Sequence, residues 1–143
     1  MPTARDIAQY ILEKRGKTAT IQLQKLVYYC QAWHLVWEDT PLFDDHVEAW
    51  ANGPVIPNLF SAHKGHFSID ASFSIGDSSS LAQNEKESID AVIAEYGKES
   101  SQHLVELTHL EDPWKEARRN CRPGERCNNV ISLAAMADYY SGL

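Results

Sequence analysis

The segment from Leu23 to Trp37, LQKLVYYCQAWHLVW, constrains the fold more than any other part of the chain. Its apolar residues recur at helical spacing and cover most of the circumference of the expected helix, which leaves only a narrow polar edge with Gln24, Gln31 and Glu38. A helix of this kind must be covered by other elements on most of its sides. We therefore predict that it supplies the structural core, through Leu23, Leu26, Val27, Cys30, Trp33 and Trp37.

Further helices are predicted from cap signals that precede apolar residues at helical spacing. Thr3 followed by Asp6 is typical of a helix start, and Gly16 ends that helix. Asp112 followed by Pro113 combines a cap residue with a first-turn proline. Other helices are expected to begin at Pro57, near Asn84, Ser100 and Ser132.

Two segments show the alternation that is typical of strands. Residues 46–50 alternate in polarity and precede Asn52 and Gly53, which tolerate the positive φ of a tight turn. Residues 66–75 alternate more strictly, and we predict that they pair with residues 47–50. The expected fold is α+β, mainly α, a single compact helical domain over residues 1–143 with a small antiparallel sheet or hairpin on one side.

Composition narrows the classes of function and partner. The net charge of -7 disfavours nucleic acid as a partner, although Arg118, Arg119, Arg122 and Arg126 form a local basic group. No apolar run is long enough to span a membrane, and the N-terminus lacks the apolar core of a signal peptide. We therefore expect a cytoplasmic protein, in which the three cysteines are reduced thiols.

The sequence contains no convincing catalytic or metal-binding set. Cys30 and His34 lie four residues apart and could act as nucleophile and base, but no orienting third group accompanies them, and a buried Cys30 explains them equally well. His63 and His66 lack a third metal ligand at a recognised spacing. The gap between Cys121 and Cys127 lies outside the usual spacing of zinc sites, and helix capping accounts for Glu111, Asp112 and Glu116. We predict no enzyme, no catalytic residue, no cofactor and no metal.

The sequence EAWANGPVIP, residues 48–57, stands out as a candidate interaction surface. It places an aromatic residue, Trp50, beside a stiff Gly-Pro turn, and rigid aromatic residues are favoured at the centres of protein interfaces. The alternative is that Trp50 belongs to the core and that the turn only holds the sheet in place.

Several blocks of sequence, taken together in their order, resemble the Panacea domain, the family of phage-associated GepA-like or SocA-like antitoxins. These blocks are LQKLVYYCQAWHL at 23–35, PLF at 41–43, EAW at 48–50, GPVIP at 53–57 and LEDPWKEA at 110–117. The chain departs from the family pattern at Cys30, Asn52 and Phe60, where alanine, an aromatic residue and tyrosine are usual.

The resemblance implies a non-enzymatic antitoxin of a toxin-antitoxin pair, of the kind often encoded in prophages. Neutralisation would occur by direct binding of a cognate protein toxin, or by presenting the toxin to a cellular protease as an adaptor. The expected partner-binding residues are Trp50, Asn52, Gly53, Pro54, Val55, Pro57, Asp112 and Trp114. Two alternatives of other classes are a small thiol hydrolase that uses Cys30 and His34, and a nucleic-acid-binding regulator that uses the C-terminal arginines.

Overall fold

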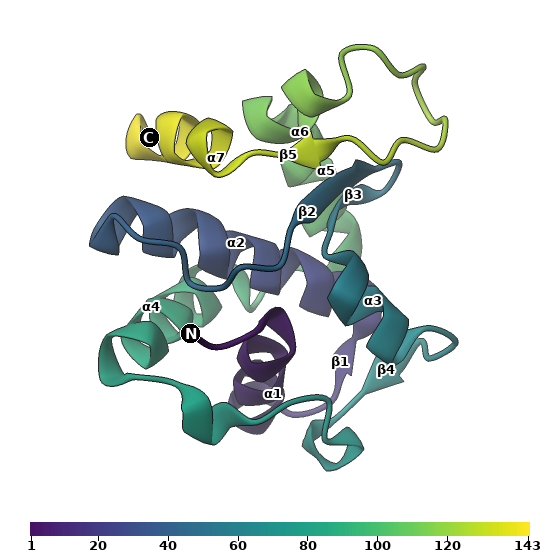
Figure 1. Ribbon diagram of the computed structural model, residues 1–143. Helices are drawn as coiled ribbons and strands as arrows, with labels where there is room; N and C mark the ends of the chain where they lie inside the picture. Colours follow the sequence, from purple (N-terminus) through teal and green to yellow (C-terminus); the bar gives the residue numbers. More distant parts are fainter.

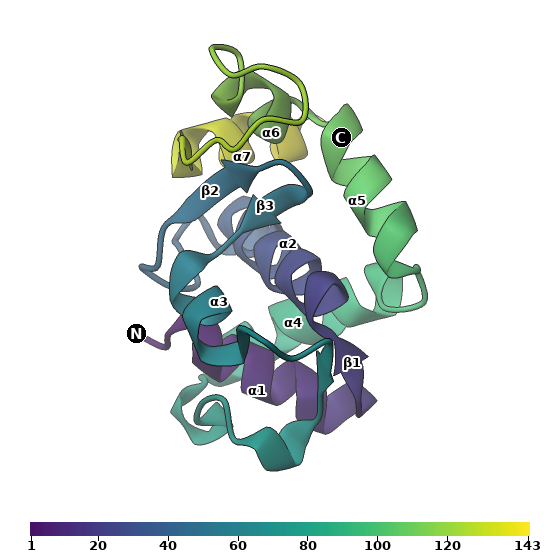
Figure 2. The same ribbon diagram turned by 90° about the vertical axis from the view of Figure 1, so that its right-hand side faces the viewer.

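The computed structural model describes residues 1–143 and is built around one long helix, α2 (Thr20–Glu38). This helix crosses the middle of the molecule, with α1 (Ala4–Arg15) and α4 (Gln83–Tyr96) on one side and α7 (Leu133–Ser141) on the other (Figure 1). A view from the side places α5 (Ser101–Leu110) along a further flank of the same helix (Figure 2). The prediction of a mainly helical α+β fold is confirmed.

The core prediction for α2 is confirmed in its N-terminal half and fails at its last turn. Leu23, Leu26, Val27 and Cys30 are fully buried, and Trp33 packs against the core while partly exposed. Trp37 is 47% exposed, so its assignment to the core is wrong. It lies two residues before Asp39, the left-handed residue that ends the helix, and there it stacks on Trp33.

The predicted polar edge of α2 is also buried over most of its length. Gln24 and Gln31 are both nearly inaccessible to solvent. The Gln31 amide donates to the Phe43 carbonyl at 2.7 Å and accepts from the Leu42 amide at 2.7 Å, so it ties the loop after α2 onto the helix. A polar side chain can be buried when both ends of its amide are paired in this way.

Most helices begin at the cap residues that the sequence predicts. Thr3 forms reciprocal hydrogen bonds with Asp6 at the start of α1, and the serine hydroxyls at 100 and 132 accept from backbone amides at the starts of α5 and α7. Proline occupies the first turn of α3 (Pro57–His63) and of α6 (Asp112–Ala117). Helix α4 begins slightly earlier than predicted, because Glu85 rather than Glu87 accepts a hydrogen bond from the capping backbone amide.

The main sheet contains the predicted hairpin and one unexpected partner. Strands β2 (Val47–Trp50) and β3 (Gly53–Val55) pair antiparallel, with Glu48 opposite Val55. The third strand is β5 (Val130–Ile131), which pairs with the other edge of β2 and gives the order β3-β2-β5. The hairpin thus joins α2 to the C-terminal part of the chain.

The predicted strand over residues 66–75 is wrong in extent and in partner. Only β4 (Ser68–Ile69) is extended, and it pairs with β1 (Thr18–Ala19) rather than with β2. The 3-10 turn η1 (Ala71–Phe73) follows, because the Asp70 carboxylate accepts from the Ser72 amide and caps it. A second 3-10 turn, η2 (Ser78–Ser80), precedes α4.

The connection over residues 118–129 folds back on itself at the edge of the molecule (Figure 1). Arg118 is buried and donates hydrogen bonds to the carbonyl groups of Ala49, Arg122 and Glu125. This anchoring brings the two cysteines of the loop together, and Cys121 and Cys127 form a disulfide. The expectation of reduced thiols is therefore wrong for this pair and correct for Cys30, which is free. None of the helices has the length and apolar character needed to cross a membrane.

Candidate functional site

The tip of the β2–β3 hairpin carries the aromatic residue that the sequence predicts as an anchor. The Trp50 ring packs edge-on against Phe60 of α3 at 5.1 Å, and its indole Nε1 donates to Glu48 Oε1 at 2.8 Å. The backbone carbonyl of Trp50 accepts a hydrogen bond from the Trp114 indole at 2.8 Å. Two of the predicted partner-binding residues, far apart in sequence, therefore meet at the hairpin.

The rest of the predicted surface divides into exposed and buried parts. Asn52 and Asp112 are exposed, while Trp50, Pro57 and Trp114 are half-buried. The other three members, Gly53, Pro54 and Val55, are buried and form the rigid support of the hairpin. Gly53 adopts a φ of 109°, and a Cβ atom there would lie 2.6 Å from the Lys25 Cε atom. The turn thus favours glycine because its φ is positive and because the Lys25 and Thr108 side chains lie so close to its backbone.

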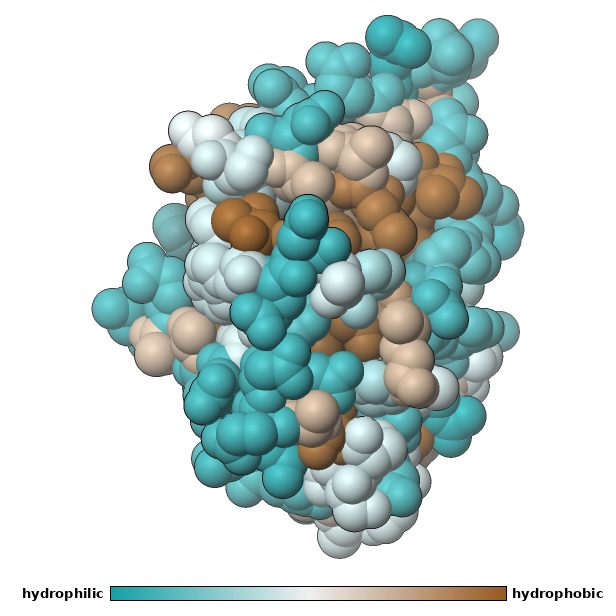
Figure 3. Space-filling view, turned by 60° about the vertical axis from the view of Figure 1, so that its left-hand side comes forward, coloured by the Kyte–Doolittle hydropathy of each residue, from teal (hydrophilic) through white to brown (hydrophobic).

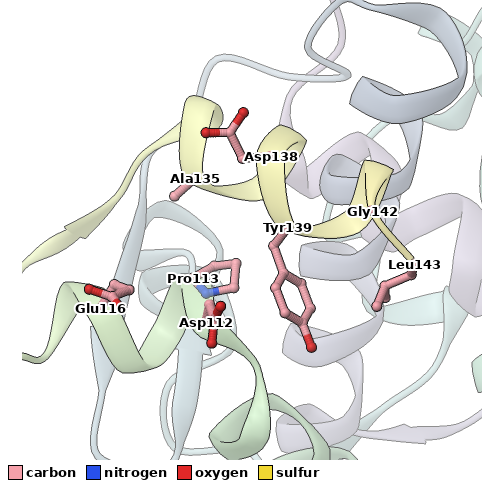
Figure 4. Close-up of a pocket in the computed structure, with 8 residues that line it drawn as sticks. All are labelled: Asp112, Pro113, Glu116, Ala135, Asp138, Tyr139, Gly142 and Leu143. Carbon is pink, nitrogen blue, oxygen red and sulfur yellow. The ribbon is translucent and has the colours of Figure 1, made fainter.

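A first recess lies between α6 and α7, with a volume of about 520 Å³. The Tyr139 ring projects from α7 towards the start of α6, beside Asp112 and Pro113 (Figure 4). Its lining includes three carboxylates, from Asp112, Glu116 and Asp138, and no basic side chain. The recess is therefore acidic, as is the protein as a whole.

A second and larger pocket, of about 690 Å³, lies between the N-terminal half of α2, the hairpin, α3 and the 118–129 connection. Trp50, Asn52 and Val55 line it, whereas Asp112 and Trp114 do not. We call it the Lys25 pocket, after the buried lysine of α2 in its wall. Of the eight predicted partner-binding residues, three therefore line this pocket and Asp112 lines the first recess, while the other four line neither.

Lys25 is the residue of this pocket that sequence reasoning missed. The side chain is 2% exposed, and no hydrogen bond or ion pair holds its ammonium group. Burial lowers the pKa of Lys25 to about 7. The sequence signal was present, since a lysine lies between Leu23, Leu26 and Val27 on a helix that is apolar almost all round.

The neighbouring polar groups are mostly paired with one another. The Gln24 amide donates to His63 Nε2 at 3.0 Å, and its oxygen accepts from the Ile56 amide at 2.9 Å. Burial lowers the pKa of His63, and an Nε2 that accepts a hydrogen bond is consistent with a neutral ring. Burial also lowers the pKa of His109, which stacks on Trp114 with ring centres 4.0 Å apart. No carboxylate lines this pocket, so no negatively charged side chain there neutralises the Lys25 ammonium.

A buried carboxylate network joins α2 to the C-terminal helices. Glu111 Oε1 accepts from the hydroxyls of Tyr29 and Tyr140, each at 2.7 Å, and Tyr140 is also paired with Tyr28 at 3.1 Å. Burial raises the pKa of Glu111. Glu111 therefore acts as a structural acceptor rather than as part of an exposed acidic cluster, and in this it differs from Asp112 and Glu116.

The residues of the thiol-enzyme alternative are not arranged for nucleophilic chemistry. Cys30 is completely buried, and burial raises its pKa, which opposes formation of a thiolate. His34 is buried as well, and its Nδ1 pairs with Ser88 Oγ at 2.8 Å. Of the four arginines in the nucleic-acid alternative, Arg118 donates hydrogen bonds to backbone carbonyls. Arg119, Arg122 and Arg126 are exposed.

Apolar side chains also reach the surface at the far end of α2. On the side of the molecule that includes this end, hydrophobic residues gather in the upper middle of the face, with polar residues above and below (Figure 3). At this end of α2, Trp33 and Trp37 line a groove of about 440 Å³ together with residues of α4 and Leu143. This groove lies beyond the hairpin and contains none of the predicted partner-binding residues.

Comparisons with known proteins agree with the blocks of sequence quoted above. The family described as "Antitoxin SocA-like, Panacea domain" matches residues 23–115. A curated protein, "Antitoxin SocA" from Caulobacter vibrioides (strain NA1000 / CB15N), is 30% identical over 127 residues, which cover 78% of this chain and 68% of that protein. No solved structure matches the chain. The matched range begins at Leu23 of α2 and ends inside α6, so it includes the hairpin and most of the wall of the Lys25 pocket.

Proposed function

Because this chain belongs to the family of antitoxin SocA-like proteins with a Panacea domain, we propose that it is an antitoxin that neutralises a cognate protein toxin by binding it directly. Family membership carries this proposal, and it implies a toxin as the partner. The buried Cys30 and the absence of an accessible nucleophile near His34 support a non-enzymatic role.

The proposed toxin-binding surface is centred on the tip of the β2–β3 hairpin. Trp50 offers an aromatic edge whose position is set by Phe60, Glu48 and Trp114, so little conformational entropy is lost when a partner covers it. Asn52 is exposed beside it. The buried residues Gly53 to Val55 contribute by holding this tip rigid rather than by direct contact.

Co-expression with the neighbouring toxin gene tests the function. The chain should relieve the growth arrest caused by the toxin, and the two proteins should purify as a complex. If arrest persists at matched expression levels and no complex forms, the chain is not the antitoxin of that toxin.

A pair of tryptophan variants tests the surface. Trp50→Ala should weaken toxin binding by at least about thirtyfold, because a central aromatic anchor typically contributes more than about 2 kcal/mol. Trp37→Ala is the matched control. Trp37 is also a partly exposed tryptophan, but it lies at the C-terminal end of α2, in a groove that contains no hairpin residue. Equal binding by the two folded variants would remove the hairpin from the interface.

A proteolytic adaptor would use the same surface, because it too must hold the toxin. The toxin half-life in cells, with and without this protein, separates the two modes. A stoichiometric inhibitor leaves the half-life unchanged or lengthens it, whereas an adaptor shortens it in a protease-dependent way.

A further inference from the structure

The Lys25 pocket differs in charge from the protein that contains it. The chain has a net charge of -7, yet no aspartate or glutamate lines this pocket. Its lining includes the cationic side chains of Lys25, Lys64 and Arg126, together with His63 and His66. An anion that enters this pocket is therefore attracted by its walls and is not repelled by a neighbouring carboxylate.

The position of Lys25 indicates where such an anion would be held. Lys64 and Arg126 are exposed, but Lys25 is 2% exposed and lies in the wall formed by α2. Its ammonium forms no hydrogen bond or ion pair within the chain, and its Nζ atom keeps a small exposed area at the pocket wall. An ammonium with so little access to water is costly unless it is paired, so a ligand that brings an acceptor to it is favoured.

The remaining walls favour a ligand with an apolar or aromatic part. Trp50 and Phe60 line the pocket and pack edge-on against each other at 5.1 Å. Among the cationic side chains of the lining only Lys25 is buried, so a group that reaches it meets one ammonium, and one carboxylate neutralises that charge. From this charge balance and these walls, we propose that the Lys25 pocket binds a carboxylate group of a protein partner, with Lys25 as the ion-pairing residue and Trp50 and Phe60 covering the adjoining apolar part.

The identity of the partner as a toxin rests on the proposed function, but the preference of the pocket for a carboxylate does not. A small probe can therefore test the pocket without any toxin. N-acetyl-phenylalanine carries one carboxylate beside an aromatic ring. Its amide keeps the ring and removes the charge, and inorganic phosphate supplies an anion without the ring.

The experiment is a titration of the isotopically labelled full chain with each probe near pH 6, observed by NMR. N-acetyl-phenylalanine should shift the signals of Lys25, the Trp50 indole and Gly53, and should bind at least about tenfold more tightly than its amide or phosphate, as expected for a charge-assisted hydrogen bond. Saturation with this probe should also raise the midpoint of the Lys25 side-chain titration by about one pH unit or more.

The variant Lys25→Met keeps the length of the side chain and removes its charge, and Lys98→Met is the control at an exposed lysine. Lys25→Met should lose at least about tenfold in affinity for the carboxylate probe, and Lys98→Met should bind as the parent protein does. Equal binding of acid and amide, tighter binding of phosphate, or no shift at Lys25 in the parent protein would each overturn the proposal.

These outcomes are separate from those of the co-expression test. If the chain binds the carboxylate probe but does not relieve the growth arrest, the pocket proposal stands and the proposed function is refuted. If the chain neutralises its toxin but the probe causes no response at Lys25, the proposed function stands and the pocket proposal is refuted.

Discussion

Replacement of Lys25 by methionine should make the protein more stable, and by an amount that depends on pH. Methionine has nearly the length of the lysine stem and fills a buried site without a charge. Burial lowers the pKa of Lys25 from its ordinary value of 10.5 to about 7. Since one pKa unit corresponds to about 1.4 kcal/mol, the buried lysine costs the folded state about 5 kcal/mol at pH values below 7.

The sign of the pH dependence follows from proton binding. Between pH 7 and pH 10.5 the unfolded chain holds a proton on Lys25 that the folded protein has released. The free energy of unfolding of the parent protein therefore rises with pH through this window, and the cost falls to about 2 kcal/mol near pH 9. His63 and His109, which face Lys25, have lowered pKa values and stay neutral throughout the window, so they add no slope there.

Urea denaturation at pH 6 and at pH 9 measures the effect. Lys25→Met should exceed the parent protein in free energy of unfolding by several kcal/mol at pH 6, and this advantage should shrink by about 2 to 3 kcal/mol at pH 9. Lys98→Met, at an exposed lysine, should show neither change. A Lys25→Met variant that is destabilised, or whose advantage is the same at both pH values, would refute the reasoning, because the ammonium would then have an acceptor or full access to water.

Two further predictions concern the C-terminal part of the chain. The parent protein should lose stability as the pH rises from 4.5 through the raised pKa of Glu111. Glu111→Gln keeps an acceptor for the two tyrosine hydroxyls and should remove this loss. Glu111→Ala leaves both hydroxyls without their acceptor and should lower the free energy of unfolding by about 2 to 4 kcal/mol. Urea midpoints measured across that pH range distinguish the two variants. The double variant Cys121→Ser with Cys127→Ser should lose about 2 kcal/mol, as expected for a disulfide that closes so short a loop. A reductant should lower the melting temperature of the parent protein and leave that of the double variant unchanged.

The parts of the fold that the sequence predicts are those with strong local signals. The helix α2 has an apolar pattern over many turns, and the Asn52-Gly53 turn determines the hairpin between β2 and β3. Strand β5 could not be predicted, because two residues are too few to show a period. The pairing of β5 with β2 depends on tertiary contacts. Among them, the buried Arg118 guanidinium donates a hydrogen bond to the carbonyl of Ala49 on β2.

The failed strand at 66–75 shows how alternation can mislead. Phe67 is 82% exposed and Phe73 is 36% exposed, so the alternating apolar residues do not form one buried face. The Asp70 cap turns the backbone after Ile69, and the Gln9 side chain of α1 then binds the backbone of Ala71 and Ile75. Local side-chain hydrogen bonds of this kind compete with strand pairing, and period alone does not reveal them.

The candidate site was predictable in its aromatic part and not in its ionic part. Trp50 and the rigid turn are evident as a motif, but the burial of Gly53 depends on how closely Lys25 and Thr108 approach the turn. Lysine is mostly exposed in proteins, so a sequence pattern assigns it to the surface unless the helix around it is known to be covered. Only the packing of the hairpin and α3 over α2 places Lys25 in a pocket wall.

The other buried polar side chains of α2 show why Lys25 is unusual. The Thr20 hydroxyl, the Gln24 and Gln31 amides, both tyrosine hydroxyls and the His34 ring all have hydrogen-bond partners within the chain. The fold thus offsets the desolvation of each of these groups, in most cases by joining α2 to another element. Lys25 receives no such compensation and instead weakens the folded state, although a methionine in its place would not. A charge held at this cost in the wall of a pocket without carboxylates is best explained by an acceptor that arrives with the partner.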